Sequence, residues 1–284
     1  MNIALITNGF FVNSKTEEIR ELLVRAFLDK GVEPVLIRNN EFFAANFKQK
    51  LPELDGVLFW DKDVLLAKYL EANGIKVVNS SEALRICDDK ALSAVALANA
   101  GIAMPKTVVA PFTYANIGYG NVDFLTAVTA QIDFPMVIKE SHGSFGQQVY
   151  LARNFDELVH TVKNIAPKPM IFQQYVECGN SDLRLQVVGG EVVAAVRRSS
   201  LNGDFRANAT LGGKMTAYAP TAEQVELALA AAKAVGAEIA GVDILPGEKP
   251  YLCEVNANAH FKRLMDATQI DVAAKIIDYV LGRV

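Results

Sequence analysis

Short apolar runs and amphipathic stretches alternate over the first 90 residues of the chain. The first apolar run covers residues 3–7, and a capping-box pattern at 14–17 precedes apolar positions spaced as on one face of a helix. Three further apolar runs are separated by helical stretches and cover residues 32–37, 56–60 and 75–78. This order is typical of β-α-β units, so the pattern predicts a small parallel α/β domain.

The rest of the chain shows a mixed pattern of helical spacing and strand-length apolar runs. Helices are predicted for residues 81 to about 100, 155–165, 222–237 and 271–281. Strands are predicted for residues 135–139, 148–152 and 170–176. Gly189 and Gly190 stand between two more apolar runs, and a Gly-Gly pair suits the positive φ angles of a two-residue turn. The pattern therefore predicts an α+β region with a β-hairpin at these glycines.

A second predicted hairpin, near the C-terminus, carries oxygen ligands. Pro246 and Pro250 flank a turn between two short apolar strands. Side chains two apart on a strand share a face, so Glu254 and Asn256 point the same way, and the turn places Asp243 opposite Glu254. Two facing carboxylates and an amide suit magnesium or manganese. The alternative is a set of exposed polar residues on an edge hairpin.

Composition limits the class of protein. The chain has 284 residues, 51% of them hydrophobic and 21% charged, which is enough for a sizeable core. Neither a membrane-spanning apolar run nor a signal-peptide pattern is present. Three widely spaced cysteines without a CxxC pair argue against a disulfide framework or a zinc site and favour a reducing cytoplasm. A net charge of −4 without a basic block argues against binding to nucleic acid.

Lys139 ends an apolar strand and precedes a loop of small residues, 141–147. Free backbone N–H groups beside a lysine can close over nucleotide phosphates, although a glycine-rich hairpin turn explains the same stretch. His142 fits a polar loop residue better than a catalytic base. After the first strand, Asn8-Gly9-Phe10-Phe11 replaces the G-x-G-x-x-G of dinucleotide-binding folds, so a nicotinamide-dependent oxidoreductase is poorly supported.

Taken in order, these and other short motifs resemble one family. The chain is similar to ATP-grasp enzymes, and most closely to the RimK-type α-L-glutamate ligases, from about residue 85 to the C-terminus. The motifs are Asp88-Asp89-Lys90, Val137-Ile138-Lys139 with the glycine loop, Gln173-Gln174-Tyr175-Val176, Asp182-Leu183-Arg184, the run 191–208, Gly212-Gly213, Gly241-Val242-Asp243-Ile244 and Glu254-Val255-Asn256. Each motif is common alone, but their order and spacing are specific.

The resemblance implies an ATP-grasp fold, of the α/β and α+β class, with an N-terminal Rossmann-like (pre-ATP-grasp) domain. The N-terminal domain would cover residues 1–90 and the ATP-grasp domain residues 91–284. The latter would have two lobes, roughly 91–175 and 176–284. The resemblance also suggests a homo-oligomer, either a dimer or a tetramer.

The resemblance further implies the site residues. Those expected around ATP are Lys90 and Lys139 at the phosphates with Gly143, Ser144 and Gly146 of the loop, Gln174 and Tyr175 at the adenine, and Asp182 at the ribose. Arg206 and Asn208 lie where the family contacts phosphate or the acyl-phosphate intermediate, although Arg206 could also be a solvated loop residue. Asp243, Glu254 and Asn256 would bind one or two Mg²⁺ or Mn²⁺ ions.

The implied activity is ATP-dependent amide formation through an acyl phosphate. An amino acid such as glutamate would be joined to the carboxylate of a small-molecule, peptide or protein acceptor. Two stretches depart from the family pattern. After Glu254-Val255-Asn256 the family usually continues with Ser-Pro-Gly-Leu, whereas residues 257–260 of this chain are Ala-Asn-Ala-His. Thr210-Leu211 also stands where the family often has His-Arg. The acceptor therefore stays open, and a ligase of lysine or arginine biosynthesis acting on a carrier protein is an alternative. His260 could meet a substrate carboxylate or simply start a helix. A non-catalytic ATP-binding regulatory module is the other alternative.

Overall fold

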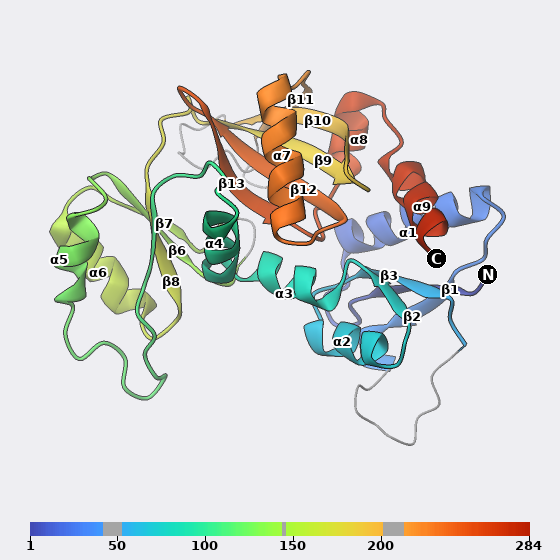
Figure 1. The fold of residues 1–284 in the computed structure, drawn as a ribbon, viewed down its shortest axis with the longest axis horizontal. Helices are drawn as coiled ribbons and strands as arrows, with labels where there is room; N and C mark the ends of the chain where they lie inside the picture. Colours follow the sequence, from blue (N-terminus) through green and yellow to red (C-terminus); the bar gives the residue numbers. More distant parts are fainter. Residues whose placement is uncertain (42–52, 144–145, 201–212) are drawn as a thin grey trace.

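The N-terminal part of the chain folds into a parallel sheet. The computed structural model describes residues 1–41, 53–143, 146–200 and 213–284. The sheet order is β2-β1-β3-β4, every pair is parallel, and helices α1 and α2 accompany it (Figure 1). These elements are β1 (Ile3–Thr7), α1 (Ser14–Asp29), β2 (Val35–Arg38), the 3₁₀ turn η1 (Asn39–Glu41), β3 (Gly56–Trp60), α2 (Val64–Ala72) and β4 (Lys76–Val78). The predicted parallel α/β arrangement is confirmed.

A second sheet, antiparallel, forms the lobe drawn in green in Figure 1. Its strand order is β5-β8-β6-β7, and α5 and α6 pack on it through one apolar cluster that includes Leu125, Leu158 and Phe172. The elements are β5 (Thr107–Val109), α5 (Phe124–Thr129), β6 (Met136–Glu140), β7 (Val149–Ala152), α6 (Phe155–Ile165) and β8 (Met170–Gln174). Helix α6 has the bounds that the apolar spacing predicts.

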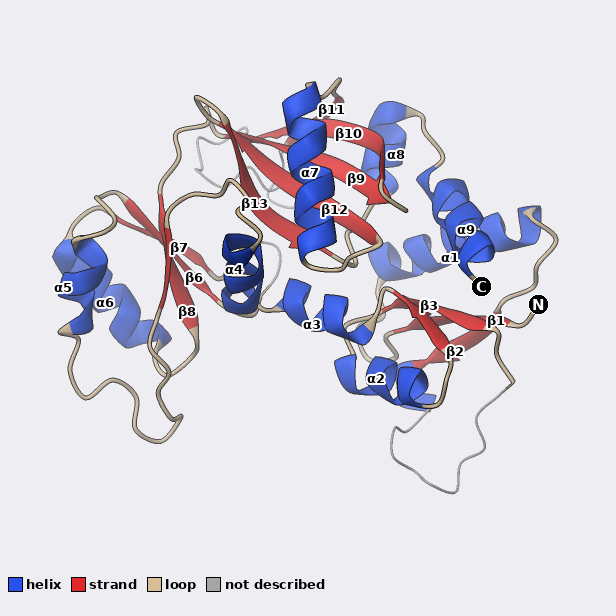
Figure 2. Ribbon diagram, viewed as in Figure 1, coloured by secondary structure: helices blue, strands red, loops and turns tan. Residues whose placement is uncertain are grey.

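A third, five-stranded antiparallel sheet has the order β11-β10-β9-β12-β13, with α7 lying along one face (Figure 2). Its elements are β9 (Ser181–Val188), β10 (Glu191–Ser199), β11 (Lys214–Ala217), α7 (Ala222–Ala234), β12 (Ile239–Pro246) and β13 (Pro250–Asn256). The C-terminal helices α8 (Lys262–Thr268) and α9 (Val272–Arg283) share an apolar cluster with β1, α1 and β10. Among the described residues no helix combines the length and apolar character needed to cross a membrane.

Both predicted hairpins form. Gly189 and Gly190 have φ angles of 60° and 87° and join β9 to β10. In the other hairpin β12 pairs with β13 so that Asp243 is opposite Glu254, as predicted. A bulge follows this pair, between Asp243 and Ile244. The register needed for a shared ligand site is therefore present.

The single helix predicted from residue 81 to about 100 is wrong. The segment forms two helices, α3 (Ser81–Asp88) and α4 (Lys90–Asn99), separated by Asp89 in an extended conformation. The Asp89 carboxylate accepts hydrogen bonds from the main-chain N of Ala91 (2.8 Å) and Leu92 (3.2 Å). Because aspartate is a strong N-cap residue, it ends one helix and starts the next.

Helix α1 also begins one residue earlier than predicted. Asn13 is its N-cap, and the Asn13 side chain accepts from the main-chain N of Lys15 (3.0 Å) and Thr16 (3.2 Å). Thr16 Oγ1 accepts in return from the Asn13 N at 3.0 Å. The capping box predicted at Ser14 and Glu17 is therefore wrong, because asparagine caps a helix as well as serine does.

One buried side chain ties the parallel sheet to the five-stranded sheet. Asn79 directly follows β4 and is 2% exposed. Its Oδ1 accepts from the main-chain N of Glu238 (2.8 Å) and Ile239 (2.9 Å) at the start of β12. Its Nδ2 donates to the carbonyls of Ile239 (2.7 Å) and Ala257 (3.0 Å), and Ala257 directly follows β13. This residue therefore fixes both ends of the β12–β13 hairpin against the parallel sheet.

We expect Asn79→Ala to destabilise the protein by about 3 kcal/mol or more, because it leaves buried main-chain groups without partners. In thermal denaturation the midpoint should fall by roughly 6–10 °C. Asn73→Ala is the matched control, since Asn73 is exposed and its side chain bonds only the nearby Tyr69 carbonyl in the described part of the chain. Equal midpoints for the two variants would contradict the role given to Asn79.

Candidate functional site

A cavity brings together residues from both antiparallel sheets and from the segment that follows β3 of the parallel sheet. It is lined by the segment after β3, by α3 and α4, and by β6, β8 and β13. The polar side chains that line it include Lys62, Lys90, Lys139, Gln173, Glu254 and Asn256. Four of these six were predicted as site residues, and Lys62 and Gln173 were not.

Lys139 presents a buried ammonium group to this cavity. The residue is 8% exposed, on β6, and Nζ lies 3.8 Å from Cys253 Sγ on β13. Burial raises the pKa of Cys253 to about 11, so the thiol is uncharged at neutral pH. Within the described residues no carboxylate is paired with this ammonium group. A buried cation without a countercharge is costly, which suits a site that receives an anion.

Lys90 and the start of the glycine loop form the next part of the wall. Lys90 begins α4, and its Nζ donates to the Gly143 carbonyl at 3.1 Å. Gly143 has a φ of 147°, and a Cβ there would lie 2.4 Å from Oε1 of Gln148. The positive φ favours glycine at this position, and the loop contacts Lys90 through its backbone carbonyl. Gly146 has a φ of 72°.

The predicted metal ligands are only partly available. Glu254 and Asn256 both line the cavity, and Asn256 Nδ2 donates to Glu254 Oε1 at 2.7 Å. Carboxylate and amide oxygens suit Mg²⁺ or Mn²⁺, so this pair fits a hard divalent ion. In the described residues no three His, Cys, Asp or Glu side chains gather closely enough to hold a metal ion.

Asp243 is engaged by two arginines that sequence reasoning did not single out. Arg184 donates from Nε and Nη2 to its two carboxylate oxygens at 2.7 Å each, and Arg198 Nη2 lies 2.8 Å from Oδ2. Burial alone would raise the pKa of Asp243, but the two guanidinium groups outweigh it and lower that pKa below its usual value. The carboxylate is therefore charged and held in place.

Arg198 also holds Asp182, which is 7% exposed, through bonds of 2.6 and 2.5 Å to its two oxygens. The ribose contact predicted for Asp182 stays a prediction. Part of this network could be predicted from the sequence, because Asp182 and Arg184 are two residues apart on one strand and therefore share a face. Arg198 could not be found this way, since its place opposite Asp182 depends on the register of β9 with β10.

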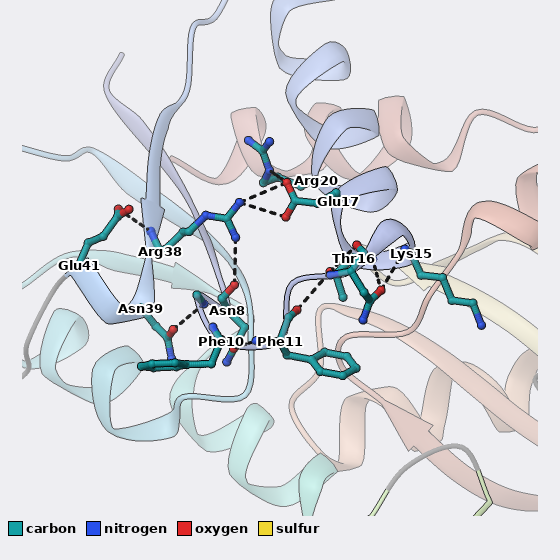
Figure 3. Close-up of polar contacts among 12 residues, drawn as sticks. Asn8, Phe10, Phe11, Lys15, Thr16, Glu17, Arg20, Arg38, Asn39 and Glu41 are labelled. Carbon is teal, nitrogen blue, oxygen red and sulfur yellow. Dashed lines mark hydrogen bonds and ion pairs between the residues drawn. The ribbon is translucent and has the colours of Figure 1, made fainter.

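The loop between β1 and α1 is fixed by polar contacts (Figure 3). Asn8 Oδ1 accepts from the main-chain N of Phe10 (2.9 Å) and Phe11 (2.7 Å), and Asn39 Oδ1 accepts from the Gly9 N at 2.8 Å. Figure 3 also shows Arg38 bound to both oxygens of Glu17, at 3.1 and 3.2 Å. The first turn of α1, which follows this loop, contacts the segment after the β12–β13 hairpin.

Two contacts join that segment to the N-terminal sheet. His260 Nε2 bonds the Lys15 carbonyl at 3.2 Å, and Asn258 Nδ2 donates to the Asp61 carbonyl. Burial lowers the pKa of His260, so its imidazole is neutral at pH 7. The first contact holds the first turn of α1, and the second holds the segment after β3, which lines the cavity at Lys62.

The remaining predicted residues are less well supported or lie outside the described structure. Gln174 and Tyr175 are not among the residues that line the cavity, whereas Gln173 is. Successive strand residues point to opposite faces, so only one of the two glutamines can face the cavity. Ser144, Arg206 and Asn208 lie outside the described residues.

Comparison with known proteins relates this arrangement to one family. A model of the RimK-like ATP-grasp domain matches residues 87–280. The probable α-L-glutamate ligase of Haemophilus influenzae is 34% identical over 220 residues, which cover 75% of this chain and 69% of that protein. Human β-citrylglutamate synthase B is 32% identical over 225 residues, 77% of this chain. The match covers 56% of the human protein, so this chain spans little more than half of that relative.

A solved structure agrees in fold. The RimK domain ATP-grasp protein of Sphaerobacter thermophilus superposes with a TM-score of 0.75 and 22% identity, over 99% of this chain and 100% of the other. This likeness confirms the predicted ATP-grasp fold. Since the domain model covers well over half of the chain, the protein belongs to the RimK-like ATP-grasp family.

Proposed function

We propose that this protein is an ATP-dependent ligase that joins an amine to a carboxylate. Glutamate is the amine that we favour, because the names of the relatives, an α-L-glutamate ligase and a β-citrylglutamate synthase, both contain it. The acceptor would be a small molecule, a peptide or a protein. Family membership supports the class of reaction, and the cavity supports a site for it.

The observation that carries the proposal is the environment of Lys139. Its buried ammonium faces a neutral thiol and a cavity that also holds Lys90 and Glu254. Nucleotide phosphates would supply the missing negative charge, and a metal ion beside Glu254 would bind the same phosphates. Lysine and metal together reduce the repulsion that an approaching carboxylate meets at the γ-phosphate.

The chemistry has two steps. The acceptor carboxylate attacks the γ-phosphorus, the bond to the leaving ADP breaks, and an acyl phosphate forms. The amine then attacks the acyl carbon and phosphate leaves, which gives the amide. The protein supplies no nucleophile. Its residues hold the two anions together and exclude water, which would otherwise hydrolyse the acyl phosphate.

Glu254 and Asn256 would hold Mg²⁺ or Mn²⁺, which supplies positive charge at the phosphates. Asp243 would join them as a third ligand by giving up one of its bonds to Arg184 or Arg198. The released guanidinium would then be free to meet a phosphate oxygen. Arg206 and Asn208 stay predictions for the acyl-phosphate end of the site, as do Gln174 and Tyr175 for the adenine.

Three broader expectations also stay predictions. They are the division into domains at residue 90, the homo-oligomeric state and the cytoplasmic location. The division cannot be drawn from packing alone, because one apolar cluster includes Leu5 and Leu23 together with Val196 and Ile276.

The proposal is tested with hydroxylamine, which traps acyl phosphates as hydroxamates. Wild-type protein would be incubated with ATP, Mg²⁺ and single carboxylic acids or peptides, and ADP and hydroxamate would be measured together. We expect at least one acid to give both products in equal amounts, and glutamate to replace hydroxylamine with amide formation seen by mass spectrometry. ATP binding without ADP formation for any acid would favour a non-catalytic nucleotide-binding module.

We expect Glu254→Gln to lower ADP formation about 100-fold or more, because the neutral amide binds a divalent ion weakly. Glu248→Gln is the matched control, since Glu248 is exposed in the turn of the same hairpin and should keep the wild-type rate. Both variants should keep the wild-type melting temperature. An unchanged rate in Glu254→Gln would reject the metal assignment.

We expect Lys139→Met to weaken ATP binding about 10- to 100-fold, because it removes a charge-assisted contact to phosphate. The apo protein should be no less stable, since a buried unpaired cation is replaced by an apolar side chain. Lys163→Met, at an exposed position on α6, is the control. Nucleotide affinity can be measured by calorimetry, and equal affinities for the two variants would refute the phosphate role.

A further inference from the structure

Lys62 brings a third ammonium group to the cavity from outside the matched domain. It follows β3 in the parallel sheet and lines the cavity together with Lys90 and Lys139. The RimK-like match begins only at residue 87. Lys62 Nζ is paired with Asp88 Oδ1, and half of the lysine side chain is exposed.

The backbone at this position is held from two sides. Asp61 is 8% exposed, and its Oδ1 accepts from the Lys62 N at 2.7 Å. Asn8 Nδ2 lies 3.1 and 3.2 Å from the two Asp61 oxygens. On the other side, Asn258 donates to the Asp61 carbonyl. Because Asn258 is two residues beyond Asn256, Lys62 is fixed relative to the β12–β13 hairpin.

The origin of Lys62 distinguishes it from the other two lysines. Lys90 and Lys139 lie within the residues that match the RimK-like domain, and Lys139 is buried on β6. Lys62 instead comes from the carboxyl edge of a parallel sheet, where ligands of such sheets commonly bind. The reaction needs a second anion, the acceptor carboxylate, within bonding distance of the γ-phosphate. A half-exposed cation on the same cavity reduces the repulsion between those two anions.

We propose that Lys62 binds the carboxylate of the acceptor and places it for attack on the γ-phosphate. The acceptor carboxylate would share the ammonium with Asp88. Lys62 is thereby a specificity-determining residue for the carboxylic-acid substrate, and not a phosphate ligand. This inference rests on the proposed ligase function.

The kinetic test uses the acid with the highest rate in the hydroxamate assay. We expect Lys62→Met to raise the KM for that acid about tenfold or more, while the KM for ATP changes about twofold or less. Lys62→Arg should recover part of the loss, because a guanidinium also binds carboxylates. Lys68→Met, at an exposed position on α2, is the control. An unchanged acceptor KM, or an equal rise in the ATP KM, would overturn the assignment.

A binding test works even if the wild type turns over no acid. Trp60, the only tryptophan of the chain, is two residues from Lys62 and packs edge-on against Phe261 with ring centres 5.5 Å apart. Its fluorescence can therefore follow titration with succinate or glutarate after saturation with Mg²⁺ and AMP-PNP. We expect binding to the wild type and to Lys68→Met, and a loss of about tenfold or more in Lys62→Met. Absence of binding to the wild type, or equal binding to Lys62→Met, would reject the inference.

The two tests separate the inference from the proposed function. If the wild type forms hydroxamate and Lys62→Met has the same acceptor KM as the wild type, the role of Lys62 is refuted and the ligase function stands. If the wild type forms no hydroxamate but binds a dicarboxylate, and Lys62→Met loses that binding, the ligase function is refuted and the carboxylate site remains.

Discussion

The arrangement of the site depends on the four hydrogen bonds of Asn79. This side chain lies where the parallel sheet meets the five-stranded sheet, and it satisfies main-chain groups at the start of β12 and directly after β13. Because the bonds are buried, none of these groups can exchange its partner for water, so a shift of one sheet against the other would leave several unsatisfied. The position of Asn256 and Asn258 relative to Asp61 and Lys62 follows from this constraint. A cavity lined by both antiparallel sheets and by Lys62, which follows the parallel sheet, requires such a fixed junction.

The charged residues of the candidate site fall into two groups with different partners. Arg184 and Arg198 neutralise Asp182 and Asp243 within the sheet, so these four residues form a closed network of little net charge. Lys139 lies on β6 of the other antiparallel sheet and has a neutral thiol beside it. The difference has a physical meaning. A paired network orders the sheet and keeps Asp243 ionised, whereas a buried ammonium beside a thiol is stabilised only when an anion enters.

Local sequence patterns predicted much of this fold. The β9–β10 hairpin, α6 and the pairing of Asp243 with Glu254 all follow from features a few residues apart, namely a Gly-Gly turn, helical spacing and a proline-flanked turn. The same reasoning failed at Asp89, where apolar periodicity continues across a residue whose side chain caps the next helix. Gln174 shows another limit. Two adjacent glutamines are equivalent in sequence, and only the pleat of β8 decides that Gln173 faces the cavity.

By itself the sequence determined the class of fold, the order of the family motifs and the oxygen-rich hairpin. These depend on turn residues, periodicity and short motifs, all of which are local. The tertiary structure decided which polar groups meet: Arg198 with both aspartates, Lys139 with Cys253, and Lys62 with Asp88 on the same cavity as Lys90 and Lys139. Such partners are separated by 16 to 114 positions in the chain, and their pairing is set by strand register and sheet packing. No periodicity within one element encodes that packing, because each element is compatible with several registers and neighbours until the core closes.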